Sequence, residues 1–146
     1  MQLVVIERDG TVQGIDAIPD VAKEALAMTV EFYGRAGFAP PWGSYIALEE
    51  DVPVGACGFK GAPKEGRVEI AYFTFPGGEN RGVATRVAAL MIEIAKVADP
   101  SVVVTARTLV EPNASHRVLI KSGFRNAGVV VDPEDGEVLE WVYEGR

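Results

Sequence analysis

The sequence has little of what several classes of protein require. Its 146 residues include one cysteine, Cys57, and one histidine, His116. A lone cysteine excludes an internal disulfide and a cluster of cysteines around a metal ion, so we expect no metal. No stretch reaches the roughly 18 uncharged apolar residues of a membrane-spanning helix, and the apolar start of the chain is too short for a signal peptide. These absences favour a cytoplasmic protein with no membrane partner.

Positive charge is scarce as well. The chain has 14 Lys and Arg against 21 Asp and Glu, which gives a formal net charge of −7. Proteins that bind nucleic acids concentrate basic residues on one surface, whereas the basic residues here are spread thinly along the chain. We therefore expect no nucleic-acid partner.

What the sequence does have is the pattern of one mixed α/β (α+β) domain over residues 1–146. Apolar residues make up 48% and charged residues 24%, the balance of an ordinary folded domain. Periodicities of 2 and 3.6 residues predict the order strand, helix, three strands, helix, strand, helix, two strands. The expected strands cover residues 3–7, 44–50, 54–60, 67–75, 102–109, 124–131 and 137–143. The expected helices cover about 19–33, 82–98 and 114–122, the last one between a capping Asn113 and a terminating Gly123.

The most informative stretch is FPGGENRGVATRVAALMIEIAK, residues 75–96, in which a glycine-rich turn leads into the long helix. The first turn of a helix carries unpaired N–H groups and a partial positive charge, so phosphates bind there. Gly78 and Gly82 would let a ligand approach the backbone, and Arg81 and Arg86 would donate hydrogen bonds to phosphate oxygens. The turn has neither the P-loop nor the dinucleotide-binding pattern. Glycines that merely introduce a helix are the alternative.

Three segments in this order, VEIAYFTFP, ENRGVAT and EPNASHRVLIKSGF, resemble the GCN5-related N-acetyltransferase (GNAT) family, most closely its branch of ribosomal-protein N-terminal acetyltransferases. The family's turn signature, Gln/Arg-x-x-Gly-x-Gly/Ala, aligns with residues 79–84, where Glu79 replaces the first amide or arginine. The resemblance implies a single GNAT-like domain. Its mixed, mostly antiparallel sheet of about seven strands would have a central parallel pair and three or four flanking helices.

The resemblance also implies acetyl-CoA as co-substrate. Its pyrophosphate would lie on the turn, with Arg81 compensating for Glu79, and its pantetheine would pair with backbone groups of Phe73 and Phe75. Asn113 would meet the pantetheine from the other side, unless it serves only as a helix cap. The cofactor-binding residues implied in this way are Phe73, Thr74, Phe75, Asn80, Arg81, Gly82, Val83, Ala84, Thr85 and Asn113.

Acetyl transfer requires a neutral amine and a hydrogen-bond donor to the thioester carbonyl. Glu69 is our candidate for the catalytic base that deprotonates the amine through a water molecule. An ion pair with Arg67 or Arg107 is the alternative role for this carboxylate. A backbone N–H near Ala71 or Tyr72 is the candidate donor to the carbonyl.

The departing thiolate also needs a proton or a hydrogen bond. Many members of the family have a tyrosine in the last helix, at the position where this sequence has Leu119. Ser115 in the same helix is the remaining candidate catalytic donor, with a capping role as the alternative. His116 beside it is expected to be a solvated side chain.

The acceptor is expected to be a primary amine, either of a small molecule or of a protein N-terminus. Tyr33 and Trp42, together with Trp141, are candidate walls of its pocket, and core positions are the alternative for these aromatic residues. A non-catalytic acyl-CoA-binding or sensing domain is the alternative function, favoured by Leu119 and Glu79. The sequence leaves the oligomeric state open, a homodimer included.

Overall fold

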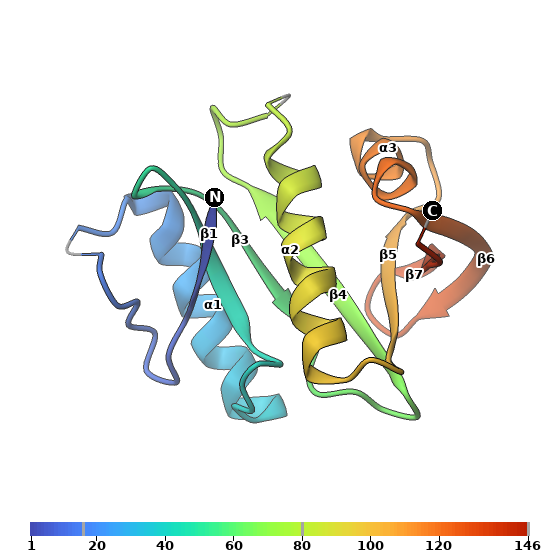
Figure 1. Ribbon diagram of the computed structural model, residues 1–146, viewed down its shortest axis with the longest axis horizontal. Coiled ribbons are helices and arrows are strands. Elements are labelled where there is room, and N and C mark those ends of the chain that lie inside the picture. Colours follow the sequence, from blue (N-terminus) through green and yellow to red (C-terminus); the bar gives the residue numbers. More distant parts are fainter. Residues whose placement is uncertain (16, 80, 146) are drawn as a thin grey trace.

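Seven strands form one sheet with helices on both of its faces (Figure 1). The computed structural model describes residues 1–15, 17–79 and 81–145. In chain order the elements are β1 (Gln2–Val5), α1 (Asp20–Ala36), β2 (Ser44–Glu49), β3 (Val52–Phe59), β4 (Arg67–Thr74), α2 (Val83–Ala98), β5 (Val103–Leu109), α3 (Ala114–Lys121), β6 (Phe124–Asp132) and β7 (Gly136–Tyr143). The order of elements predicted from the sequence is confirmed, and their bounds agree to within a few residues.

The strand order across the sheet is β1-β2-β3-β4-β5-β7-β6. Neighbouring strands are antiparallel except β4 and β5, which are parallel and are connected through α2. The predicted α/β domain with about seven strands, a central parallel pair and three or four flanking helices is therefore confirmed, and the described part of the chain has three helices. None of the three described helices is long and apolar enough to cross a membrane.

The helices divide between the two faces of the sheet. Helix α1 lies behind β1, β2 and β3, whereas α2 and α3 lie in front (Figure 1). Along β4, side chains alternate between these faces, so Val68 and Ile70 are buried in the main core under α2. The smaller core under α1 contains Ile6, Val12, Ala22, Ile46, Leu48 and Phe75. Strand β4 therefore contributes side chains to both faces of the sheet, and the candidate site lies beside it.

Helix α2 is anchored by an apolar stripe at four-residue spacing. Val83, Val87, Met91 and Ala95 are all buried, as expected for residues that repeat on one face of a helix. Burial of the stripe fixes the helix over β4 and β3 and therefore fixes where its N-terminal turn lies.

Strands β4 and β5 pair only at their beginnings. The parallel register runs from Arg67 opposite Val103 to Ile70 opposite Ala106, and it ends there although β4 continues to Thr74. Beyond this point the two strands diverge toward the end of the sheet where α2 begins and α3 lies (Figure 1). The second half of β4 thus borders an opening in the sheet.

Candidate active site

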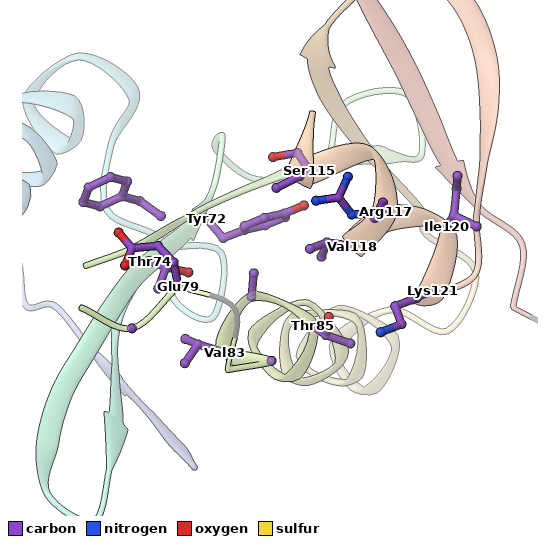
Figure 2. Close-up of a pocket in the computed structure, with 15 residues that line it drawn as sticks. Tyr72, Thr74, Glu79, Val83, Thr85, Ser115, Arg117, Val118, Ile120 and Lys121 are labelled. Carbon is purple, nitrogen blue, oxygen red and sulfur yellow. The ribbon is translucent and has the colours of Figure 1, made fainter. Parts of the chain in front are cut away.

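The opening between β4 and β5 contains a cavity of about 680 Å³, which we call the splay cavity. Figure 2 shows that side chains from the end of β4, the start of α2 and one face of α3 surround it. Its lining residues are Tyr72, Phe73, Thr74, Gly78, Glu79, Gly82, Val83, Ala84, Thr85, Ala114, Ser115, Arg117, Val118, Ile120 and Lys121. Segments far apart in the sequence therefore meet around one ligand-sized space.

The N-terminal turn of α2 opens onto this cavity. Gly82 precedes the helix with φ of 77°, a left-handed conformation that glycine adopts without the strain of a side chain. The predicted cofactor residues Gly82, Val83, Ala84 and Thr85 all line the cavity. Arg81 is exposed and does not line it, and Asn80 lies outside the described residues. The unpaired N–H groups of a first helical turn attract anions, so this end of the cavity suits a phosphate.

Arg86 contacts the glycine-rich turn, and its predicted hydrogen bond to a phosphate stays a prediction. Its Nη1 donates a hydrogen bond to the Arg81 carbonyl at 3.0 Å, and its Nη2 pairs with the Glu49 carboxylate at the end of β2. Both ends of the guanidinium are therefore engaged. Arg86 fixes the glycine-rich turn to the neighbouring hairpin, and this tether is the structural role of the residue.

The Glu79 side chain bends back and accepts a hydrogen bond from its own loop. Its Oε1 accepts a hydrogen bond from the Gly77 N–H at 2.9 Å, and the side chain lines the splay cavity, as Figure 2 shows. A carboxylate on the wall of the cavity repels the negative charge of a ligand bound there. Glu79 therefore opposes anion binding at the turn.

The backbone groups of β4 alternate in direction between its two neighbouring strands. Toward β3, the Lys60 N–H donates to the Glu69 carbonyl at 2.8 Å, and the Phe75 N–H donates to the Val54 carbonyl at 2.9 Å. Because the antiparallel register between these pairs is regular, every odd-numbered residue from 69 to 75 directs its N–H and C=O groups to β3. The expectation that Phe73 and Phe75 pair with a ligand through their backbones is therefore wrong.

The even-numbered residues face the opening instead. In the continuous strand, the N–H and C=O groups of Tyr72 and Thr74 point to the side of β5, beyond Ile70, where the pairing with β5 ends. A ligand chain in the splay cavity would extend the sheet by bonding to these two residues. Of the two candidates for the donor to a thioester carbonyl, only the Tyr72 N–H faces the cavity.

Helix α3 closes the cavity on the other side, and its start is capped by Asn113. The Asn113 Oδ1 accepts a hydrogen bond from the Ser115 N–H at 2.9 Å, and its Nδ2 donates to the Glu111 carbonyl. The capping role of Asn113 is confirmed, whereas its predicted contact with a ligand stays a prediction. Ser115 lines the cavity. His116 does not; its Nε2 contacts the Leu109 carbonyl at 2.9 Å, and its ring packs on Trp141.

The sequence reasoning missed two basic residues on α3. Arg117 and Lys121 are one helical turn apart, and both line the splay cavity opposite the start of α2 (Figure 2). Their four-residue spacing was a readable signal, but it shows only that they share a face of the helix. Together with the start of α2, they give the cavity a positive rim in a chain of net charge −7.

A second cavity of about 760 Å³ lies on the other side of β4, against α1; we call it the α1 cavity. Exposed apolar side chains border it, with Val21 40%, Met28 65% and Phe73 56% exposed. Its lining residues are Asp20, Val21, Glu24, Ala25, Met28, Thr29, Phe32, Arg35, Ser44, Ala56, Cys57, Gly58, Phe59, Lys60, Ala71, Tyr72, Phe73, Pro76 and Glu134. Tyr72 and Phe73 line both cavities, so ligands in the two cavities would meet near the end of β4.

A cavity that runs along β4 to the N-terminal turn of α2 lies where the sequence resemblance places acetyl-CoA. The sequence profile of the acetyltransferase (GNAT) domain matches residues 7–125. The chain belongs to the GNAT acetyltransferase family. This confirms the predicted family and, with it, the predicted class of enzyme, which transfers an acetyl group from acetyl-CoA to an amine.

Solved acetyltransferases share the fold of this GNAT domain. A chimera of the spermidine N-acetyltransferase SpeG from Vibrio cholerae with hSSAT has a TM-score of 0.72 at 13% identity, over 98% of this chain and 95% of that one. RimL, a ribosomal L7/L12 α-N-protein acetyltransferase in complex with coenzyme A, has a TM-score of 0.62 at 17% identity, over 82% of this chain and 69% of that one. The aminoglycoside acetyltransferase AAC(6')-Ib with coenzyme A has 0.61 at 20%, over 71% of this chain and 66% of that one. No curated protein matches the sequence.

Glu69, the candidate base of this GNAT domain, is held in ion pairs. Its carboxylate lies 3.1 Å from Lys60 Nζ and 3.9 Å from Arg107 Nε, whereas Arg67 pairs with Glu140. Glu69 lines neither described cavity, but its partner Lys60 lines the α1 cavity. The carboxylate thus lies just beyond the end of that cavity, and its catalytic role stays a prediction.

The aromatic residues expected around the acceptor lie elsewhere in the GNAT fold. The Tyr33 hydroxyl donates to the Ile6 carbonyl at 2.9 Å and accepts from the Ser44 N–H at 2.8 Å, so it joins α1 to β2. Trp42 packs edge-on against Phe59, and Trp141 is buried with its Nε1 bonded to Thr108. None of the three lines a described cavity. The aromatic walls of the α1 cavity are Phe32, Phe59, Tyr72 and Phe73 instead.

Cys57 also lines the α1 cavity, but it is not a nucleophile. The side chain is buried, and this burial raises the pKa of the thiol to about 12. At neutral pH it is therefore a protonated, apolar side chain. Among the described residues, no group of three or more His, Cys, Asp and Glu side chains is placed to bind a metal ion.

Glu79→Gln is expected to strengthen the binding of CoA by about 5- to 10-fold, since one like-charge interaction near a surface is worth about 1 kcal/mol or more. The amide keeps the acceptor oxygen for the Gly77 N–H and removes the negative charge. Isothermal titration with CoA at low and high salt measures the change. The exposed Glu65, in the turn before β4, supplies the control Glu65→Gln, which leaves the affinity unchanged. Equal affinities of Glu79→Gln and the parent would contradict the proposed position of the phosphates.

Proposed function

We propose that this GNAT domain binds acetyl-CoA in the splay cavity and transfers its acetyl group to a primary amine that enters through the α1 cavity. The observation that supports this most directly is that Tyr72 and Phe73 line both cavities. A thioester at the end of one cavity and an amine at the end of the other would come together at β4. Direct attack is then the simplest mechanism, because the buried Cys57 thiol is not available for a covalent intermediate.

In this proposal, each part of the coenzyme has its own partner. The pyrophosphate lies at the N-terminal turn of α2 between Gly82 and Thr85, with Arg117 and Lys121 on the opposite side. The pantetheine follows β4 and bonds to the backbone groups of Tyr72 and Thr74, as an added strand would. This places the thioester near the beginning of the opening.

The chemical step needs three contributions from the protein. The amine must lose a proton, for which Glu69 is the proposed base through water, with Lys60 and Arg107 holding its carboxylate. The Tyr72 N–H donates to the thioester oxygen as it gains charge. The third contribution is orientation, because the adjoining cavities hold the amine and the thioester next to each other.

We propose an acceptor amine that carries an apolar body. The α1 cavity combines the exposed Val21, Met28 and Phe73 with the carboxylates of Glu24 and Glu134. Carboxylates at the rim attract the ammonium group, and the apolar wall binds what is attached to it. A lipophilic amine or a protein N-terminus with apolar residues fits this surface better than a polyamine. The cytoplasmic location and the possibility of a homodimer stay predictions.

The proposed function is tested by titration with acetyl-CoA, followed by an assay of thiol release over a panel of amines. The panel comprises an alkyl or aryl monoamine, a peptide with an apolar N-terminal residue, spermidine and an aminoglycoside. We expect binding of acetyl-CoA and amine-dependent release of CoA, fastest with the first two. Binding without amine-dependent release would support the non-catalytic domain instead, and no binding would refute both.

Glu69→Gln is expected to lower kcat by about 10², with the Kd of CoA unchanged, because the residue lies outside the splay cavity. Steady-state kinetics and titration measure the two quantities. Glu140→Gln is the matched control, since Glu140 is as exposed as Glu69, at 19%, and pairs with Arg67 and Arg107. Similar losses of kcat in the two variants would show that the ion pairs matter only for structure.

A further inference from the structure

Two buried side-chain polar atoms lack a hydrogen-bond partner among the described residues, the Tyr72 hydroxyl and the Arg107 Nε. The other guanidinium nitrogens of Arg107 bind Asp132 and Glu140, so this side chain is largely satisfied. The Tyr72 side chain has only one polar atom, its hydroxyl, and no hydrogen bond of normal geometry reaches it. A buried hydroxyl without a partner destabilises a fold, so it requires an explanation.

The position of this hydroxyl supplies one. Tyr72 extends from β4 across the splay cavity toward the first turn of α3, where Ser115 and Arg117 lie (Figure 2). Tyr72 lines both cavities, and its backbone N–H faces the opening between β4 and β5. The phenol therefore lies in the splay cavity, on the side of β4 along which the pantetheine of acetyl-CoA is proposed to run.

Three other side chains lie near this place. His116 is bound to the Leu109 carbonyl and does not line the cavity. Ser115 lines it, and its hydroxyl is the competing donor, whereas its N–H is used in the cap of α3. Leu119 is fully buried and has no polar atom to offer.

We propose that the Tyr72 hydroxyl donates a hydrogen bond to the sulfur of acetyl-CoA as the thiolate leaves. This rests on the proposed function. In the step, the amine nitrogen forms a bond to the acetyl carbon, the C–S bond breaks, and its electron pair stays on sulfur. The proton of the amine passes to the base and to water. The thiolate, held by the phenol, takes a proton from solvent as CoA departs.

Burial suits the phenol to this role. It raises the pKa of Tyr72 to about 12, while Ser115, which lies close without a hydrogen bond of normal geometry, opposes the shift. The phenol therefore stays protonated throughout the neutral range. A thiol has a pKa of about 8.5, so the phenol is the weaker acid. It stabilises the thiolate as a hydrogen-bond donor and keeps its own proton.

The test is Tyr72→Phe, which keeps the ring and removes the hydroxyl. We expect kcat to fall about 10- to 100-fold, the range for loss of one donor to a developing charge, with the KM for acetyl-CoA within about threefold. A second readout does not depend on turnover. In the complex with CoA, the pKa of the bound thiol, measured from the ultraviolet absorbance of the thiolate, rises in the variant.

Two further variants separate this role from a structural one. Tyr45 is also a buried tyrosine whose pKa burial raises to about 12, but its hydroxyl donates to the Pro41 carbonyl at 2.6 Å. Tyr45→Phe should lower the Tm and leave kcat unchanged, whereas Tyr72→Phe should leave the Tm unchanged or raise it, because no hydrogen bond is lost. Ser115→Ala tests the competing donor.

The outcomes are distinguishable from failure of the proposed function itself. If acetyl-CoA binds and amines are acetylated, but Tyr72→Phe changes neither kcat nor the pKa of the bound thiol, the proposal for Tyr72 is wrong. A large loss in Ser115→Ala with none in Tyr72→Phe would assign the donor to Ser115. If no acetyl-CoA binds to the parent protein, the proposed function fails first.

Discussion

Gly82→Asp is expected to weaken CoA binding by more than about 100-fold, since two like charges about 4 Å apart near a protein surface repel by about 4 kcal/mol. The new carboxylate would lie at the N-terminal turn of α2, where the pyrophosphate is proposed to bind. A Cβ at this position would meet only the flexible end of Arg86, at 3.2 Å. The positive φ costs about 1 kcal/mol, and Asp tolerates it better than most residues.

Gly82→Asn is the matched control. Asparagine has the same shape, tolerates the left-handed conformation and can cap the helix, but it carries no charge. We expect it to bind CoA within about fivefold of the parent, since it has the same steric effect and lacks the repulsion. Titration with CoA, with Tm measured in parallel, compares the three proteins. Equal losses in the two variants would show that the effect is steric, and equal binding in all three would place the phosphates elsewhere.

Ala71→Phe is expected to lower kcat/KM for the amine by about 100-fold or more, because a misplaced reactant loses most of the advantage of orientation. Ala71 lies on the α1 side of β4, directly opposite Gly58, which has no side chain to fill the space. A phenyl ring there would occupy the α1 cavity at the end where the acetyl group is proposed to emerge. The Kd of CoA should stay within about threefold, as Ala71 does not line the splay cavity.

Ala127→Phe, an equal increase in size at an exposed alanine of β6, should change neither quantity. Steady-state kinetics with the best amine of the panel and titration with CoA give the two numbers. If Ala71→Phe weakened CoA binding as much as it lowered kcat/KM for the amine, the two cavities would not be separate sites. Full activity in that variant would show that the amine enters by another route.

Much of the cofactor side was predictable because its signal is local. A glycine that permits a left-handed turn immediately before an apolar helix is recognisable in the sequence, and Gly82 with Val83, Ala84 and Thr85 indeed lines the cavity. The same applies to Asn113, whose cap depends on the residue two positions later. Such features follow from backbone conformation and from neighbours within one helical turn.

The prediction for the backbone of β4 failed for a reason that is not local. Alternation along a strand reveals which side chains share a face of the sheet. It does not reveal which residues direct their N–H groups to which neighbouring strand. The pairing of Lys60 with Glu69 decides that, and it assigns Phe73 to β3 and Tyr72 to the opening.

The acceptor side depended on tertiary structure almost entirely. Tyr33 and Trp42 have the size and position in the chain of pocket residues, but hydrogen bonds and packing place them in the core region. Glu134, by contrast, lies in the β6–β7 turn, more than 100 residues after Asp20 in the sequence, and yet both residues line the α1 cavity. No spacing in the sequence indicates that these two carboxylates share a rim.

The sequence by itself determined the order of elements, the glycine turn before α2 and the family, because each depends on periodicity, backbone conformation or a motif within one segment. The tertiary structure decided which atoms face the two cavities. Strand register, the early end of the β4–β5 pairing and the packing of α1 and α3 bring Tyr72, Ser115 and Arg117 together. Contacts between distant segments depend on how the whole chain packs, and the sequence of any one segment does not specify them.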